Sequence, residues 1–254
     1  MKELCMIVGA LALSTFLISC DKNEIQSISD SLVASYPFDG DAKDASGNGF
    51  NGVIHGAQLT EDRNGSLESA YYFDGNLSYI DLGNPRALKR YMSDYTLTGW
   101  IKLQSYPPTY NSIIMSNRNH ETSPISGSFI GIGGLQSSLS KRLEYIQNAT
   151  PTDDEFTYDF MSSNTHIDLD TWYFFCVSYK YQGNQSNLVK VYVDGLLESQ
   201  KLMGEVINPE NVNTYLGCEP VLRPVEYSFH GCMDDIRIYD RALSESEIES
   251  LYER

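Results

Sequence analysis

Short apolar runs that end in turn-forming dipeptides recur along almost the whole chain, and this pattern limits the possible folds more than any other feature. Asp39-Gly40, Asp74-Gly75 and Asp194-Gly195 each follow such a run. Glycine in these pairs readily adopts the positive φ that tight hairpin turns need. About a dozen runs of strand length without an internal helical period are typical of an antiparallel sandwich. The sequence therefore predicts an all-β domain of two packed sheets.

The predicted strands are followed by one short helix at the C-terminal end. Ser244 and Glu247 have the spacing of a capping box, and Ile248, Leu251 and Tyr252 form one apolar stripe. The predicted strands cover residues 32–38, 53–55, 70–73, 79–82, 95–103, 112–115, 127–132, 142–147, 157–161, 173–179, 188–193, 213–217 and 227–239, with a short strand near Val206.

The 254-residue chain is divided into three parts by its N-terminal region. Lys2 precedes 16 uncharged residues, Leu4 to Ser19, which is shorter than the about 20 residues of a membrane-spanning helix and suits a signal peptide. The run ends Leu17-Ile18-Ser19-Cys20, which resembles a bacterial lipobox. We expect a signal peptide over 1–19, a lipidated Cys20 with a polar tether over 20–31, and one domain over 32–254. An ordinary secretory signal with a chance cysteine is the alternative.

The lipobox interpretation implies a cellular location, and the net charge excludes one class of partner. A lipid on Cys20 would hold the protein to the cell envelope. We expect the outer membrane as its location, and the protein could be exposed at the cell surface. The lipid anchor is then its only expected contact with a membrane. Lys and Arg number 18 against 34 Asp and Glu, so the net charge is −16. Such a chain repels phosphate backbones, so we expect no nucleic-acid partner. The oligomeric state stays open.

Six segments, in order, resemble the concanavalin A-like, laminin-G-like (LamG) jelly-roll domains of bacterial surface proteins, here of a Bacteroidetes-type lipoprotein. They span nearly all of the chain after the tether, and they comprise residues 32–49, 72–83, 95–102, 170–174, 191–195 and 229–244. The resemblance implies two twisted antiparallel sheets packed face to face. It does not by itself imply one function, because this fold carries lectins, adhesins, glucanases and spacer domains.

A structural calcium ion is expected where the chain's first loop meets its last strand. Strand alternation places Asp234 on the same face as Ile236 and Ile238, toward the core, where a carboxylate is costly unless it is paired or coordinated. Calcium prefers such oxygen ligands. The resemblance implies that Asp39 and Asp44 of the first loop complete the site. A salt bridge from Asp234 to a neighbour such as Arg241 is the alternative.

The remaining cysteines suggest one disulfide. Cys218 and Cys232 lie in two strand-like runs joined by a short loop, so they could face each other across a hairpin in an oxidising envelope. Free thiols are equally compatible with the sequence. Cys176 lies in an apolar strand and is expected to be buried.

No catalytic constellation is evident. The four histidines are scattered, there is no Gly-x-Ser-x-Gly elbow, and the Glu-x-Asp-x-x-Glu strand of glucanases with this fold is missing. We therefore expect a binding protein and not an enzyme.

A carbohydrate site is expected in two polar insertions, residues 104–126 and 145–166. Sugars are held by aromatic faces together with hydrogen bonds from amide and carboxylate groups. Trp100 and Trp172 fall in central strands and are expected in the core. The candidate ligands are Tyr106, Tyr110, Asn111, Asn117, Arg118 and Asn119 in the first insertion, and Tyr145, Tyr158 and Asp159 in the second. For each of them, a position in an ordinary polar loop is the alternative.

The sequence therefore predicts a non-catalytic, envelope-anchored module that binds a glycan or surface polysaccharide or acts in adhesion. A glycan hydrolase or lyase of this fold, or a structural protein-binding module, is the alternative.

Overall fold

The computed structural model describes residues 28–89, 93–120, 125–137, 139–148, 158–183, 186–220 and 226–254. The predicted signal peptide, Cys20 and most of the tether lie outside these residues. In the described part of the chain, no helix has the length and apolar character needed to cross a membrane.

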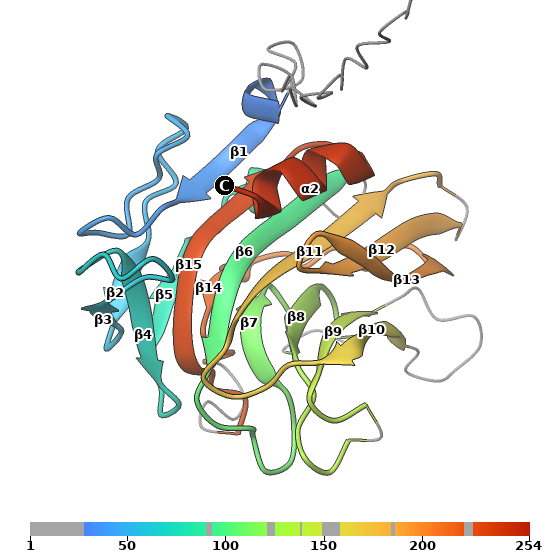
Figure 1. The fold of residues 1–254 in the computed structure, drawn as a ribbon. Helices are drawn as coiled ribbons and strands as arrows, with labels where there is room; N and C mark the ends of the chain where they lie inside the picture. Colours follow the sequence, from blue (N-terminus) through green and yellow to red (C-terminus); the bar gives the residue numbers. More distant parts are fainter. Residues whose placement is uncertain are drawn as a thin grey trace, which may run out of the picture.

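Two antiparallel sheets form a sandwich, as predicted (Figure 1). The first sheet has the order β13-β12-β11-β6-β15-β4-β3, with β1 paired to β15, and the second has the order β10-β9-β8-β7-β14-β5-β2. The strands of the first sheet are β1 (Leu32–Tyr36), β3 (Gln58–Thr60), β4 (Ala70–Asp74), β6 (Tyr95–Leu103), β11 (Trp172–Lys180), β12 (Asn187–Val193), β13 (Leu196–Met203) and β15 (His230–Tyr239). Those of the second are β2 (Val53–His55), β5 (Tyr79–Asp81), β7 (Ser112–Ser116), β8 (Ser128–Ile132), β9 (Arg142–Asn148), β10 (Tyr158–His166) and β14 (Tyr215–Leu216).

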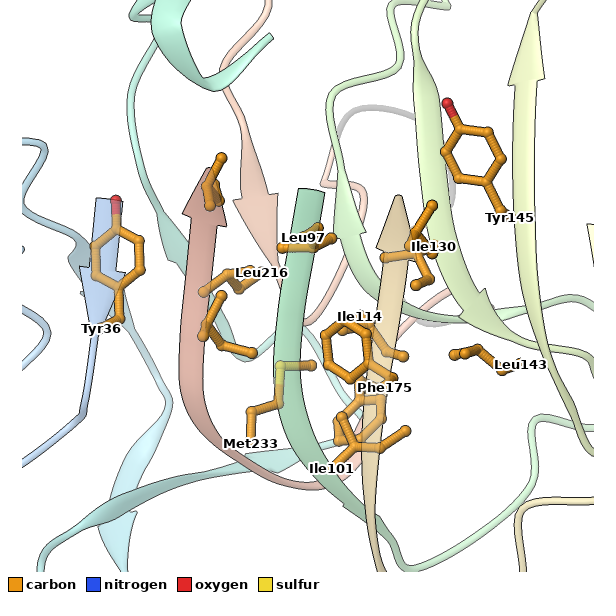
Figure 2. Packing of buried hydrophobic residues seen from close by; sticks show 14 of the residues in the cluster. Tyr36, Leu97, Ile101, Ile114, Ile130, Leu143, Tyr145, Phe175, Leu216 and Met233 are labelled. Carbon is orange, nitrogen blue, oxygen red and sulfur yellow. The ribbon is translucent and has the colours of Figure 1, made fainter. Parts of the chain in front are cut away.

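The core lies between the two sheets. Alternate residues of each strand point inward, so Ile101 and Phe175 of the first sheet pack toward Ile114 and Ile130 of the second (Figure 2). All four are almost fully buried. The period-2 pattern that predicted the strands is therefore the pattern that fills this core.

The outer face of the first sheet is partly covered by α2 (Glu245–Tyr252) (Figure 1). Ile248 and Leu251 pack on Phe174, Cys176 and their neighbours. Ser244 accepts from the Glu247 backbone N–H, and the Glu247 side chain accepts from the Ser244 backbone, which confirms the predicted capping box. Cys176 is fully buried there, as expected.

The predicted inward position of Asp234 is wrong, because β15 contains a β-bulge. Asp234 pairs with Trp100, whereas Arg237 pairs with Thr98, so β15 has one extra residue in this interval. Asp235 in the bulge has φ 50°. The bulge lets Met233 and Ile236 both enter the core, and Asp234 consequently lies on the outer face with Trp100.

The predicted hairpin between the two runs that carry Cys218 and Cys232 is also wrong. Cys218 follows β14, which pairs with β5 and β7 in the second sheet. Cys232 lies in β15, which pairs with β1, β4 and β6 in the first sheet. Both are buried free thiols, so the predicted disulfide is absent from the structure.

Both tryptophans lie on the outer face of the first sheet and not in the core. Gly99 and Ile101 point inward in β6, so the strand alternation turns Trp100 outward, where it stacks on Tyr252 with ring centroids 5.7 Å apart. Trp172 is half-buried opposite Lys102, whose Nζ lies 5.1 Å from the ring centroid.

Candidate functional site

The outer face of the second sheet, called here the open face, carries no helix in the described part of the chain. One row of paired residues crosses all of its strands: Phe160, Ile146, Phe129, Ser116, Tyr215, Asp81 and Val53. Because paired residues project to the same side of a sheet, these side chains share the open face. Phe160 and Val53, at the two ends of the row, are exposed.

Three aromatic rings form a platform at the β2–β5–β14 end of the open face. His55 stacks on Tyr79 with centroids 4.4 Å apart and an interplanar angle of 14°. Tyr79 meets Tyr215 edge to face at 5.8 Å. His55 is exposed and the two tyrosines are half-buried, so this aromatic platform (His55, Tyr79 and Tyr215) is accessible from solvent. Ile80 and Leu216 fill the core from the same strands, which orients the platform outward.

A fixed carboxylate–amide pair lies next to the aromatic platform. Asn213 Nδ2 donates to Oδ1 and Oδ2 of Asp81 at 3.0 and 2.9 Å, and the Gly83 backbone N–H donates to Oδ1 at 2.7 Å. Burial and the nearby Asp81 carboxylate raise the pKa of Tyr215. The phenol therefore stays protonated at neutral pH and can donate a hydrogen bond. Asp81 is half-buried, so the pair combines fixed geometry with partial access.

A second group of polar side chains, called here the polar cluster, lies at the centre of the same face. It comprises Ser116, Arg118, His120, Asn148 and Glu219. Ser116 Oγ donates to Glu219 Oε1 at 3.0 Å, and His120 Nε2 lies 3.0 Å from the same oxygen. Arg118 Nε donates to Asn148 Oδ1 at 3.3 Å. Glu219 is only 2% exposed, so these groups mainly hold one another.

A third carboxylate of the open face belongs to Glu144 on β9. Asn111 Nδ2 donates to its Oε2 at 2.5 Å, while Oε1 has no partner among the described residues. Burial raises the pKa of Glu144 to about 7. Asn111, a predicted sugar ligand, is therefore engaged with another side chain of the protein.

The predicted sugar ligands do not gather into one site. Several of them fix loops: Tyr106 donates to the Ile167 carbonyl, Asn117 accepts from the Ser128 backbone N–H, and Asn119 donates to the Glu210 carbonyl. Tyr145 is buried and accepts from the Tyr95 hydroxyl, and Asp159 accepts from the Gly204 backbone N–H.

Three predicted ligands lie near a surface or the open face. Tyr110 is 41% exposed and stacks on Tyr227 at 5.0 Å. Tyr158 is 53% exposed on β10, at the edge of the open face. Arg118 belongs to the polar cluster, where its guanidinium lies 5.2 Å from the Phe129 ring centroid.

The aromatic platform and the Asp81–Asn213 pair were not predicted from the sequence. One signal was present in the sequence: alternation in Tyr79-Ile80-Asp81 places Tyr79 and Asp81 together, opposite the apolar Ile80. The pairing of β14 with β5, which brings in Tyr215, had no local signal.

The predicted calcium ligands do not fit a single ion. Asp44 accepts backbone N–H groups of Ser35, Ser46 and Phe50 and so organises its own loop. Asp39 is exposed, and Asp234 binds Arg63 with NH1 2.5 Å from Oδ2. Among the described residues, no three His, Cys, Asp or Glu side chains form a group suited to a metal ion. The salt-bridge alternative matches the contacts of Asp234, with Arg63 and not Arg241 as its partner.

Comparison with known families agrees with this architecture. The model described as "Concanavalin A-like lectin/glucanases superfamily" matches residues 74–249. The chain belongs to the concanavalin A-like lectin/glucanase superfamily. No curated protein matches the sequence at a significant level.

Two toxin binding domains are among the solved structures similar to this concanavalin A-like domain. The binding domain of Paraclostridial Mosquitocidal Protein 1 has a TM-score of 0.66 and 19% identity, over 89% of this chain and 52% of that chain. The ligand-binding domain of botulinum neurotoxin serotype D, in complex with N-acetylneuraminic acid, has a TM-score of 0.62 and 17% identity, over 91% and 52%. The chain thus spans about half the length of these two toxin domains.

Domain 4 of AbnA, an extracellular arabinanase from Geobacillus stearothermophilus, is matched over nearly its full length. It has a TM-score of 0.62 and 20% identity, over 87% of this chain and 98% of that chain, and its structure contains arabinotriose. At such identities the likeness shows the shared fold.

Proposed function

We propose that this concanavalin A-like domain binds a glycan, without cleaving it, at the aromatic platform and the Asp81–Asn213 pair of the open face. The observation that carries the proposal is the position of three accessible rings beside a fixed carboxylate. Aromatic rings pack on the C–H faces of sugars, and fixed carboxylate and phenol groups select their hydroxyls.

The structural relatives support a glycan as the ligand. The AbnA domain is matched over nearly its full length and binds arabinotriose. The neurotoxin domain binds N-acetylneuraminic acid, but it is matched over only half of its length, so it supports the proposal less directly.

The carboxylates of the open face support binding without hydrolysis. Glycosidases use two carboxyl groups that flank the scissile bond, one of them free to donate a proton. Of the three carboxylates described above, Glu144 and Glu219 are buried and only Asp81 is partly accessible, so they offer no pair of accessible carboxyl groups to flank a bound sugar. Incubation of the purified protein with a polysaccharide panel should therefore release no reducing ends.

The proposal also places the protein at the cell envelope, with Cys20 as its lipid anchor. The support is the Leu17-Ile18-Ser19-Cys20 pattern after an uncharged run. An anchored module of this kind would hold a polysaccharide at the cell surface.

The test is a glycan array followed by affinity measurements with the full chain in mild detergent. Tyr215→Ala and Asp81→Asn should each weaken binding of the best ligand by about tenfold or more, as expected for anchor residues of a binding site. Tyr110→Ala, an exposed aromatic of the first insertion, is the matched control and should bind as the parent does. Loss of binding in Tyr110→Ala but not in Tyr215→Ala would move the site to the insertion. Failure to bind any glycan would favour a protein-binding module.

A further inference from the structure

A cavity of about 30 Å³ lies between the two sheets, away from the aromatic platform. Its walls are mainly apolar: Leu97, Val177 and Ile238 come from the first sheet, and Met115 and Ile130 from the second. A volume of about 10–15 Å³ on this measure holds one water, so the cavity has room for about two water-sized groups.

A lysine lines this apolar cavity without an anionic partner. Lys89 follows η1 (Arg86–Leu88) and is only 4% exposed. Its Nζ donates to Asn84 Oδ1 and to the Pro209 carbonyl, the latter at 3.1 Å. Within the described part of the chain no carboxylate forms an ion pair with it, and burial lowers the pKa of Lys89. An ammonium has three N–H donors, and the described residues accept two of them.

Neutral acceptors alone compensate a buried positive charge poorly. An ammonium removed from water is costly unless an opposite charge accompanies it, and Asn84 and Pro209 supply only neutral oxygens. Asn117 also lines the cavity, where its Oδ1 accepts from the Ser128 backbone N–H. A cavity whose described lining holds a lysine and no carboxylate has the chemistry of an anion site.

We propose that this inter-sheet cavity binds a small monovalent anion, a halide or a carboxylate of the size of formate, against Lys89. The volume excludes larger acids, and the apolar walls exclude strongly hydrated multivalent anions. The bound anion links the segment after η1 to both sheets and so stabilises the sandwich.

The test is thermal unfolding of the full chain at neutral pH and constant ionic strength. Chloride, bromide or formate replaces gluconate, which is too large for the cavity. An anion concentration tenfold above Kd should raise Tm by about 3–5 °C relative to gluconate, and this increase in Tm should saturate. Saturation by halides but not by formate would identify a halide site, and the reverse result a carboxylate site.

Two comparisons separate this site from general salt effects. Lys89→Met should abolish the anion dependence, whereas Lys43→Met, which removes a lysine with a 74% exposed side chain, should retain it. Crystals of the unaltered protein grown in bromide should show anomalous density within hydrogen-bond distance of Lys89 Nζ. Three results would overturn the proposal: equal Tm values in all anions, an unchanged anion dependence of Tm in Lys89→Met, or bromide density only at sites away from Lys89. Lys89 would then be a neutral or hydrated amine.

Discussion

Asp234 shows how burial and neighbouring charges determine the protonation state of one side chain. It is 2% exposed and binds Arg63, which also lies 4.7 Å from the Trp100 ring centroid. Burial, followed by the charge of Asp235, raises the pKa of Asp234 to about 7, although Arg63 acts in the opposite direction. The carboxyl therefore titrates near neutral pH.

The raised pKa predicts how stability depends on pH. Asp234 has an ordinary pKa of 3.8 and a folded pKa of about 7, so between these values the folded state binds more protons than the unfolded state. Stability should therefore fall as pH rises through this window, and the raised pKa of Glu144 adds to the same trend. Chemical denaturation at several pH values should show a smaller slope for Asp234→Asn. An unchanged slope would contradict this assignment.

Removal of Arg63 should lower the free energy of unfolding more than removal of the Asp234 charge does. Arg63→Met leaves a buried carboxylate unpaired and should lower the free energy of unfolding by about 3 kcal/mol at pH 8. The loss should shrink at pH 5, where Asp234 is protonated. Arg63→Met/Asp234→Asn should recover part of the stability, and denaturant titration of the three variants measures all of these differences.

The contacts of Asp234 and Asp44 also predict the response to calcium. Their oxygens already bind Arg63 and backbone N–H groups, respectively, so calcium should add nothing to the folded state at this position. Scanning calorimetry with calcium and with chelator should give Tm values within about 1 °C, since only a ligand that binds the native state shifts Tm. A larger shift that Asp234→Ala removes would restore the calcium site.

At the scale of elements, α2 is the clearest case in which local sequence and tertiary contacts agree. Its capping box starts the helix, and Ile248 and Leu251 attach it to the first sheet. Arg241 donates to both oxygens of Glu247 at 2.7 and 2.5 Å. These bonds and the cap lower the pKa of Glu247 to about 2. The helix is therefore joined to the end of β15 by charge as well as by packing.

Removal of the cap should destabilise the domain by a defined amount. Ser244→Ala deletes the side-chain acceptor for the Glu247 N–H and should cost about 1 kcal/mol. Glu249→Ala, at an exposed position of the same helix, is the control and should stay within about 0.5 kcal/mol of the parent. Equal losses in both variants, measured by urea unfolding, would show that the cap contributes nothing specific.

At the scale of the whole molecule, the two outer sheet faces differ. The first sheet is partly covered by α2 and carries both tryptophans, whereas the second presents the aromatic platform. A lipid at Cys20 would attach the domain to the envelope through the segment that leads to β1. The anchored domain would then have the aromatic platform of the second sheet available for a ligand.

The anchor is tested by fractionation of cells. Cys20→Ala removes the thiol that would carry the lipid, so the protein should leave the membrane fraction and appear in the soluble fraction. Cys176→Ala, which alters a buried thiol of the first sheet, should remain with the membranes. An unchanged distribution of the Cys20 variant would refute the lipoprotein hypothesis.

The sequence by itself determined the elements and the fold class. Alternation and turn dipeptides predicted β6 to the residue and most other strands within a few residues, because period 2 reflects burial of one face of each strand. The largely exposed strands β3 and β13 are missing from the predicted ranges, and β10 extends through part of the predicted second insertion to His166, because exposed strands lack an apolar period. The described residues form no strand near Val206, where a short one was predicted. The capping box is local, so it too was predicted correctly.

Tertiary structure alone decided the positions of the candidate functional side chains. A bulge at Asp235 changed the face of Asp234, and the separation of β14 and β15 into different sheets kept Cys218 from Cys232. The aromatic platform exists because β5 pairs with both β2 and β14, which joins residues 55, 79 and 215. Register and pairing between distant strands depend on how the whole sandwich packs, and no local run of residues encodes them.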